Sequence, residues 1–164
     1  MTLKLERPSI ESQLYWAPSQ IEGAGNGLYC HIAIRKGQKI GEYRGRLLPE
    51  EAAKNKYIDK RYFIETHILV NGQEKLFYID GSDLIRNPLG YANHADAGTE
   101  RCNARARELD NGRVYVYATR VINADQEICW EYCRGWTTEM GKALSALPFP
   151  FPAAPKNEGA CAEL

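Results

Sequence analysis

The dipeptide Asn71-Gly72 stands between two runs of residues that favour extended backbone, and it constrains the fold more than any other part of the chain. Asn-Gly readily adopts the positive φ angles of the two-residue turn that joins antiparallel strands. The flanking segments, 62–70 and 75–80, are rich in β-branched and aromatic residues. The sequence therefore predicts a β-hairpin near the middle of the chain.

Short segments of the same kind, each bounded by turn residues, recur along most of the chain. The other predicted strands cover residues 14–16, 28–34, 39–45, 104–109, 114–119 and 127–132. Short helices are predicted over 48–60, where Pro49 and two glutamates suit a first turn, over 84–89 and over 137–147. We expect a mainly β domain of several small sheets with two or three short helices.

The predicted organisation is one domain with short extensions at both ends. Residues 1–12 are expected to form an arm, 13–136 the domain, 137–147 a helix, and 148–164 an extended Pro-rich tail. Lys plus Arg and Asp plus Glu balance at 21 each, so no global field draws the chain to nucleic acid or to an anionic membrane. No apolar run approaches the ~20 residues of a membrane span, and residues 1–8 lack the apolar segment of a signal peptide.

The cysteines indicate a reducing, intracellular location. They are odd in number and scattered, which argues against a disulfide framework. Cys129 and Cys133 have a spacing that could suit a metal ion, but no second Cys/His pair accompanies them, so no metal site is expected.

Three glycines at alternate positions, Gly23, Gly25 and Gly27, invite a nucleotide-binding interpretation that fails on inspection. The dinucleotide fingerprint needs a third glycine three residues after the second, and that residue is Leu28 or Cys30 here. The residues after Gly27 are strand-like, so no helix N-terminus is available for a pyrophosphate. The glycines could still let the backbone approach a ligand, and the alternative is a plain glycine hairpin.

The most polar feature among the predicted strands is the segment 90–96 with the nearby Asn103. It places Asn93 beside His94, with small residues around them that allow other segments to come close. A short polar strip among apolar strands is typical of a binding site, whereas a surface turn with an Asx hydrogen bond is the simpler alternative.

Four separated segments together resemble the SET domain, the fold of lysine methyltransferases that use S-adenosylmethionine. They are Gly25-Asn26-Gly27, Tyr43-Arg44-Gly45, Asn93-His94 with Asn103, and the segment Glu127–Tyr132. The resemblance runs from about Ile21 to Tyr132. It implies a β-clip fold of small curved sheets, in which the C-terminal segment passes under a loop near Asn-His and forms a pseudoknot.

The resemblance also implies a role for individual residues. Tyr132 matches the catalytic tyrosine, and Tyr43, Trp130 and Tyr132 would line the substrate channel. The residues expected to hold the cofactor are Gly25, Asn26, Gly27, Tyr91, Asn93, His94 and Trp136. The implied partner is a protein or peptide, most commonly a histone tail, with no direct contact to nucleic acid or membrane. The implied location is the nucleus or the cytoplasm, or the host nucleus for a pathogen or virus.

The sequence departs from the family pattern at several positions. Ala95 replaces a common serine, and Trp130 replaces a Phe or Tyr that tunes the number of methyl groups added, which favours lower methylation states. The cysteine-rich post-SET module is absent, so the helix after Trp136 or the Pro/Phe tail is the candidate to close the channel. These departures motivate the alternative of a SET-like module that has lost catalysis and binds a peptide or partner.

Overall fold

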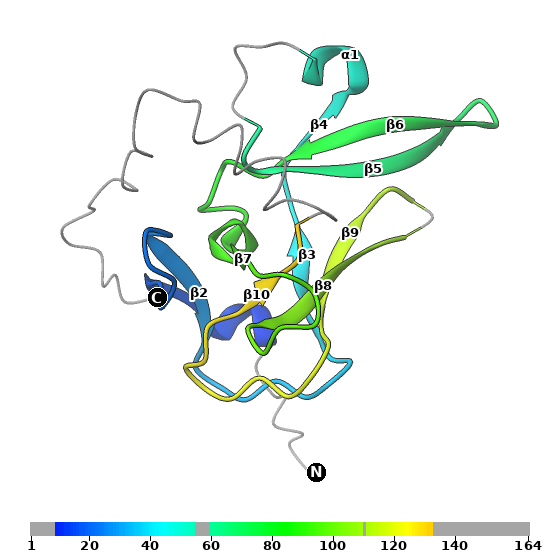
Figure 1. Ribbon diagram of the computed structural model, residues 1–164. Coiled ribbons are helices and arrows are strands. Elements are labelled where there is room, and N and C mark those ends of the chain that lie inside the picture. Colours follow the sequence, from blue (N-terminus) through cyan, green and yellow to red (C-terminus); the bar gives the residue numbers. More distant parts are fainter. Residues whose placement is uncertain (1–8, 55–59, 110, 133–164) are drawn as a thin grey trace, which may run out of the picture.

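The computed structural model describes residues 9–54, 60–109 and 111–132 (Figure 1). Trp136 and the segments predicted as a C-terminal helix and a Pro-rich tail lie outside these residues, as do residues 1–8 of the predicted arm. The division into arm, domain, helix and tail therefore stays a prediction.

The described chain is built mainly from strands, which confirms the predicted class. In chain order the elements are η1 (Ile10–Gln13), β1 (Leu14–Pro18), β2 (Asn26–Cys30), β3 (Lys39–Tyr43), β4 (Arg46–Pro49), α1 (Glu50–Ala53), β5 (Phe63–Val70), β6 (Gln73–Asp80), η2 (Pro88–Tyr91), β7 (Asn93–His94), β8 (Cys102–Glu108), β9 (Val114–Ala118) and β10 (Cys129–Trp130), where η marks a 3₁₀ helix.

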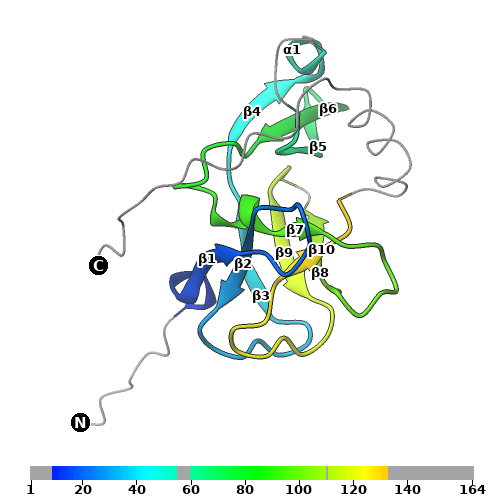
Figure 2. The ribbon, with the colours of Figure 1, turned by 60° about the vertical axis from the view of Figure 1, so that its left-hand side comes forward.

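Three small sheets carry the fold, and Figure 2 shows them from the side. β1 and β2 form an antiparallel pair, β4, β6 and β5 form a second sheet in that order, and the largest sheet has the order β3-β9-β8-β10-β7. The hairpin predicted from Asn71-Gly72 is confirmed: β5 and β6 pair from Phe63↔Asp80 to Val70↔Gln73. Asn71 (φ 53°) and Gly72 (φ 77°) both take the positive φ of the expected turn.

Several predicted boundaries were wrong because tertiary pairing decided them. In the described part of the helix predicted over 48–60 there is a single turn, α1, because residues 46–49 form β4 and pair with β6, while residues 55–59 lie outside the described ones. The helix predicted over 84–89 is instead the 3₁₀ helix η2, which begins at Pro88. The strand predicted over 127–132 keeps only two residues, β10.

β10 makes the C-terminal crossing that the family resemblance implies. It lies between β7 and β8 and runs parallel to both. Residues 95–101, which join β7 to β8, therefore have to cross over β10 to connect the two strands. Asn103, 1% exposed, fixes this strand: its Nδ2 donates to the Glu127 carbonyl (2.8 Å), and its Oδ1 accepts from the Cys129 N–H (3.0 Å). The pseudoknot of the C-terminal segment is thus present.

The core lies where the sheets meet and consists of apolar side chains from nearly every element. Its fully buried members include Leu28, Ile34, Ile40, Leu89, Val116, Ile122 and Ile128. Ile10 of η1 packs against this core, so the described end of the predicted arm is built into the domain. Among the described residues no helix is long and apolar enough to cross a bilayer.

Candidate active site

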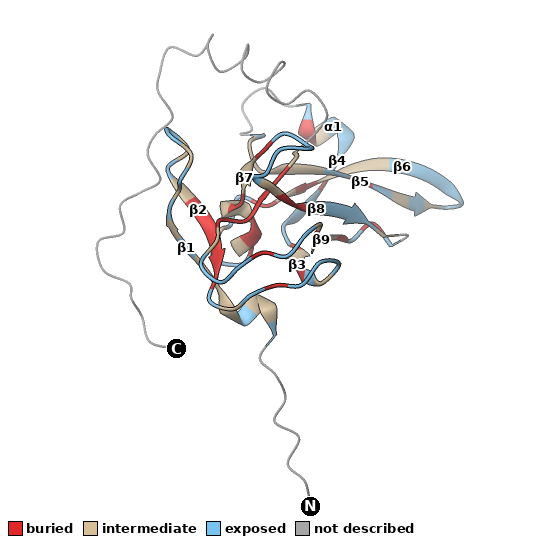
Figure 3. Ribbon diagram, turned by 60° about the horizontal axis from the view of Figure 1, so that its bottom comes forward, coloured by how far each residue is buried: buried red, intermediate tan, exposed pale blue. Residues whose placement is uncertain are grey.

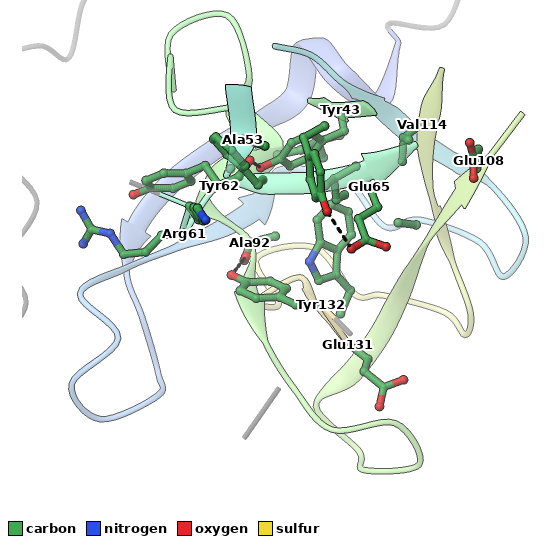
Figure 4. Close-up of a pocket in the computed structure, with 18 of the residues that line it drawn as sticks. Tyr43, Ala53, Arg61, Tyr62, Glu65, Ala92, Glu108, Val114, Glu131 and Tyr132 are labelled. Atoms are coloured by element: carbon green, nitrogen blue, oxygen red, sulfur yellow. Dashed lines mark hydrogen bonds between the residues drawn. The ribbon is translucent and has the colours of Figure 1, made fainter. Parts of the chain in front are cut away.

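A cavity of about 560 Å³ lies between the β4-β6-β5 sheet and the largest sheet (Figure 4). The three residues predicted for a substrate channel, Tyr43, Trp130 and Tyr132, all line this cavity. Further aromatic rings, among them Tyr62 and Tyr78, complete a largely apolar wall.

Tyr43 ends β3 and is held rigidly. Its ring is 5% exposed, and its hydroxyl donates to the Tyr62 carbonyl (2.9 Å). A Cβ at Gly81 would lie 2.5 Å from Tyr43 Cε1, so only glycine lets the backbone pass this ring. Asn87 lies beside both residues and donates from Nδ2 to the Gly81 carbonyl (3.0 Å). Burial holds the pKa of the Tyr43 phenol well above its ordinary value.

Trp130 separates the two predicted channel tyrosines. Its ring centroid lies 5.7 Å from that of Tyr43 and 6.3 Å from that of Tyr132. The indole is 3% exposed and sits on β10, which is fixed on both sides by its neighbours in the sheet. An indole in this position narrows the space between the two phenols, because it is bulkier than Phe or Tyr.

Tyr132 follows β10 and contacts Ala92 and His94. Its hydroxyl donates to the Ala92 carbonyl (2.5 Å), and its backbone N–H donates to His94 Nδ1 (3.2 Å). The Tyr132 and His94 rings meet edge to face at 5.3 Å. Burial raises the pKa of the Tyr132 phenol far above its ordinary value, so the group is a neutral phenol at physiological pH.

His94 holds the Tyr132 backbone in one orientation. Because Nδ1 accepts the Tyr132 N–H, the neutral ring carries its proton on Nε2, which lies 3.1 Å from Asp96 Oδ1 and can donate to it. The pairing of His94 with Asp96 was not foreseen, since the sequence offered only their separation of two residues as a signal.

Asn93 and the segment Gly25-Asn26-Gly27, which we call the glycine loop, form a polar cluster next to this cavity wall. Asn93 Nδ2 donates to Glu127 Oε1 (2.9 Å), to the Asn26 carbonyl (3.0 Å) and to Ser19 Oγ (3.2 Å). Gly25 takes a φ of +74°, which a residue with a side chain rarely adopts. The structure thus brings together Asn93 and the Gly25-Asn26-Gly27 segment, which were both assigned to the cofactor.

Glu127 organises the polar cluster, although no individual role was predicted for it. It is 6% exposed, and its carboxylate accepts from Ser19 Oγ (2.7 Å), the Gln20 N–H (2.9 Å) and the Asn93 amide. A Cβ at Gly27 would lie 2.3 Å from its Oε1, so Gly27 gives the carboxylate its room. The signal was available, because Glu127 opens the Glu-x-x-x-x-Tyr segment.

Of the remaining predicted site residues, Tyr91 stacks on Trp16 at 5.6 Å, and Trp136 lies outside the described residues. Within the described part of the chain no group of three His, Cys, Asp or Glu side chains is placed to hold a metal ion.

Comparisons with known proteins agree with this geometry. The SET domain family model matches residues 25–133, more than half of the chain. A curated relative, the histone-lysine N-methyltransferase set-17 of Caenorhabditis elegans, is 28% identical over 87% of this chain. The chain spans 48% of the length of that relative.

Solved structures share the fold. The methyltransferase domain of human PR domain-containing protein 2 matches with a TM-score of 0.58 and 24% identity, covering 79% of this chain and 80% of that chain. The polycomb repressive complex 2 of Chaetomium thermophilum matches with a TM-score of 0.53 and 22% identity, covering 74% of this chain and 15% of that chain. A ctPRC2 structure bound to S-adenosylmethionine matches with a TM-score of 0.55 and 22% identity, covering 80% of this chain and 16% of that chain. The chain belongs to the SET domain family.

Proposed function

We propose that this chain is a protein-lysine N-methyltransferase that uses S-adenosylmethionine. The observation that carries the proposal is the junction at residues 92–94. Ala92 and His94 bind the tyrosine of the apolar cavity, while Asn93 binds the glycine loop. One short strip therefore joins a cavity suited to a lysine side chain to a polar cluster suited to an amino-acid ligand.

The residues of the polar cluster fit the methionine part of this cofactor. Three acceptors hold Asn93 Nδ2, which fixes the amide and directs its Oδ1 away from them as an acceptor for an ammonium group. Gly25 has open space where a side chain would stand, so the backbone there can approach a ligand, whereas the space at Gly27 is taken by Glu127. Gly25, Asn26, Gly27, Asn93 and His94 are the residues assigned to this site.

When bound, S-adenosylmethionine supplies an electrophilic methyl group on a sulfonium. The protein must then deliver a lysine amine in its neutral form, although a free lysine has a pKa of about 10.4. The apolar cavity around Tyr43 and Trp130 removes water from the ammonium and lowers its pKa. Its aromatic walls also restrict the direction from which the nitrogen approaches.

Tyr132 orients the amine rather than deprotonating it. Its proton is donated to the Ala92 carbonyl, so toward a lysine amine the phenol oxygen acts as an acceptor and not as a donor. A phenol with a pKa this far raised remains protonated at neutral pH, so its oxygen acts through its dipole and lone pairs. Accepting an N–H from the lysine aligns the nitrogen lone pair for transfer.

The substrate is a basic protein, with a histone tail as the first candidate. The cavity wall carries charges of both signs, from Glu50, Glu65, Glu108 and Glu131 and from Lys54, Lys60 and Arg61, so its charge does not select the substrate. The curated relative is a histone-lysine N-methyltransferase, which supports the choice of a histone tail. The buried thiols of Cys30 and Cys129 are free and agree with a reducing compartment, nuclear or cytoplasmic.

The test uses the full chain, cofactor labelled on its methyl group, and a panel of histone-tail peptides together with cell extract. We expect label on lysine, and a rate about 100-fold lower for Tyr132→Phe, because one oriented polar contact in the transition state is lost. Calorimetry should show cofactor affinity of this variant within about twofold of the parent, which a general loss of folding would not preserve. Cofactor binding without any labelled lysine would instead favour the catalytically inactive peptide-binding module.

A further inference from the structure

The outer face of the largest sheet carries a row of basic and aromatic side chains. Arg105 on β8, Tyr117 on β9 and Lys39 on β3 are direct neighbours across three adjacent strands. In the next row Arg107 lies beside Tyr115. Because side chains alternate along a strand, all of them project from the same face. Figure 3 shows that much of β8 is exposed.

This face is hollowed beside Tyr117. A cleft of about 360 Å³ opens there, lined by Lys36, Arg105, Arg107, Tyr117 and Thr119 together with small residues. The three cations come from two separate segments, the turn before β3 and the strand β8, and all three are exposed. The cleft therefore presents positive charge on two sides of one aromatic ring.

The positive charge of the cleft is not compensated locally. Within the described parts of the chain Lys36, Arg105 and Arg107 form no ion pair. The carboxylate of this face, Glu42, accepts two hydrogen bonds from Arg113 (2.7 and 2.6 Å), and these hold its pKa below the ordinary value. The balance of 21 cationic and 21 anionic residues holds for the whole sequence, so it is compatible with a local excess of positive charge at this cleft.

The two tyrosines differ in what their rings can still contact. Tyr115 is engaged by Lys39, whose Nζ lies 4.9 Å from the ring centroid, and by the Arg113 guanidinium at 5.2 Å. Among the described residues Tyr117 has no such contact, and its ring borders the cleft. Tyr117 is thus the ring on which an incoming planar group could stack.

We propose that this face, which we call the Tyr117 cleft, binds single-stranded nucleic acid. Exposed lysines and arginines attract phosphates, and an aromatic ring on a sheet is a platform for an unpaired base. An acidic peptide would use the cations alone and leave the ring without a partner. A duplex keeps its bases stacked inside the helix, where Tyr117 cannot reach them.

The Tyr117 cleft and the candidate active site can be occupied together. Along β8, Ala106 and Glu108 line the cavity, whereas Arg105 and Arg107 line the cleft. Alternate residues of one strand face opposite sides of a sheet, so the two sites are separated by the sheet itself. The inference therefore goes beyond the proposed function and stands or falls independently of it.

Fluorescence anisotropy of the full chain with a labelled oligo(U) 12-mer tests the proposal. We expect binding at low salt, with log affinity falling against log salt with a slope of about −2 to −3, since each of three or four cations contributes about −0.7. Arg105→Ala combined with Arg107→Ala should reduce the slope by about 1.4. Tyr117→Leu should weaken binding about tenfold while leaving the slope unchanged, because stacking is lost and charge is not.

The control removes two cations elsewhere, by Lys75→Ala combined with Arg86→Ala, and should leave oligonucleotide affinity within about twofold. Circular dichroism of each variant verifies that it is folded. The proposal is overturned by absence of binding at low salt, by equal losses in the control and the Arg105/Arg107 variants, or by an unchanged affinity of Tyr117→Leu. Tighter binding of a 12-base-pair duplex or of a poly-glutamate peptide would assign the cleft to that partner and reject ours.

Discussion

Replacing Gly27 by alanine tests whether the buried carboxylate of Glu127 organises the candidate cofactor site. The new Cβ would lie 2.3 Å from Glu127 Oε1 and 2.8 Å from Cδ, distances at which one of the two groups must move. A free side chain would swing aside at little cost. Glu127 is instead 6% exposed and bound by Ser19, Gln20 and Asn93.

The magnitude follows from the two ways of relieving the contact. If Glu127 stays, overpacking lowers the free energy of unfolding by about 1–3 kcal/mol. If Glu127 moves, charge-assisted hydrogen bonds worth about 1.5–3 kcal/mol each are broken. We therefore expect Gly27→Ala to lower the free energy of unfolding by about 3 kcal/mol.

Urea denaturation followed by circular dichroism measures this change. The matched control is Gly41→Ala, since Gly41 is a buried strand glycine at which a Cβ would meet its nearest atoms at an ordinary 3.5 Å. Its free energy of unfolding should change by no more than about 1 kcal/mol, because only backbone entropy and a methyl group are altered.

A double-mutant cycle identifies the cause. In a Glu127→Ala background, Gly27→Ala should cost less than about 1 kcal/mol, because its collision partner is gone. If Gly27→Ala is as stable as the parent, or equally harmful in both backgrounds, Glu127 does not fill the space that Gly27 leaves.

Three further changes probe the site and its supports. A hydrogen bond to Glu108 raises the pKa of His67; burial raises that of Glu108, but hydrogen bonds from His67 and Thr66 bring it below its ordinary value. The stability from this pair should therefore be lost below pH about 4, where Glu108 takes up a proton, and above pH about 6.5, where His67 loses one. Glu108→Gln should reduce the change of melting temperature with pH in both ranges, as measured by thermal denaturation. Trp130→Phe should shift products toward higher methylation states in mass spectrometry, since the indole between the phenols is removed. Asn103→Ala should lower the free energy of unfolding by about 2–4 kcal/mol in urea, because a buried carbonyl and a buried N–H lose their partners.

Local signals were sufficient to predict much of the fold. Asn71-Gly72 specifies its own turn through backbone preference, so the hairpin was found at the right residues. β9 was found because Val114 and its neighbours are β-branched and aromatic residues with high β propensity. Both elements depend on residues close to one another in the sequence.

Elements that depend on distant partners were missed or misplaced. β4 contains Arg46 and Pro49 and has little β propensity, but pairing with β6 about 30 residues later in the chain makes it a strand. β10 is a two-residue parallel strand held by Asn103, and so short a segment has no period to detect.

The candidate site divides in the same way. The family motifs identified the residues that meet at the site, including Tyr43, Asn93 and Tyr132. The side chains that hold them in place come from distant parts of the sequence. Glu127 bonds Asn93 across a separation of 34 residues. Asn87 bonds Arg44, the neighbour of Tyr43, across 43 residues. The family motif marks Glu127 as a residue of interest, but the partners of its buried hydrogen bonds and of those of Asn87 are set by the folded geometry and cannot be read from a single sequence.

The strip from Ala92 to His94 also makes the Gly27 experiment a test of catalysis. Asn93 is tied to Glu127, and its two chain neighbours are tied to the hydroxyl and the backbone N–H of Tyr132. A displaced Glu127 should therefore shift Tyr132 through one or two peptide units, and small misplacements of this size reduce rates strongly. If this coupling holds, saturating cofactor will not restore the turnover of Gly27→Ala on a lysine peptide. If saturating cofactor fully restores the turnover of Gly27→Ala, the glycine loop and Tyr132 act independently, and the junction at residues 92–94 does not contribute to catalysis.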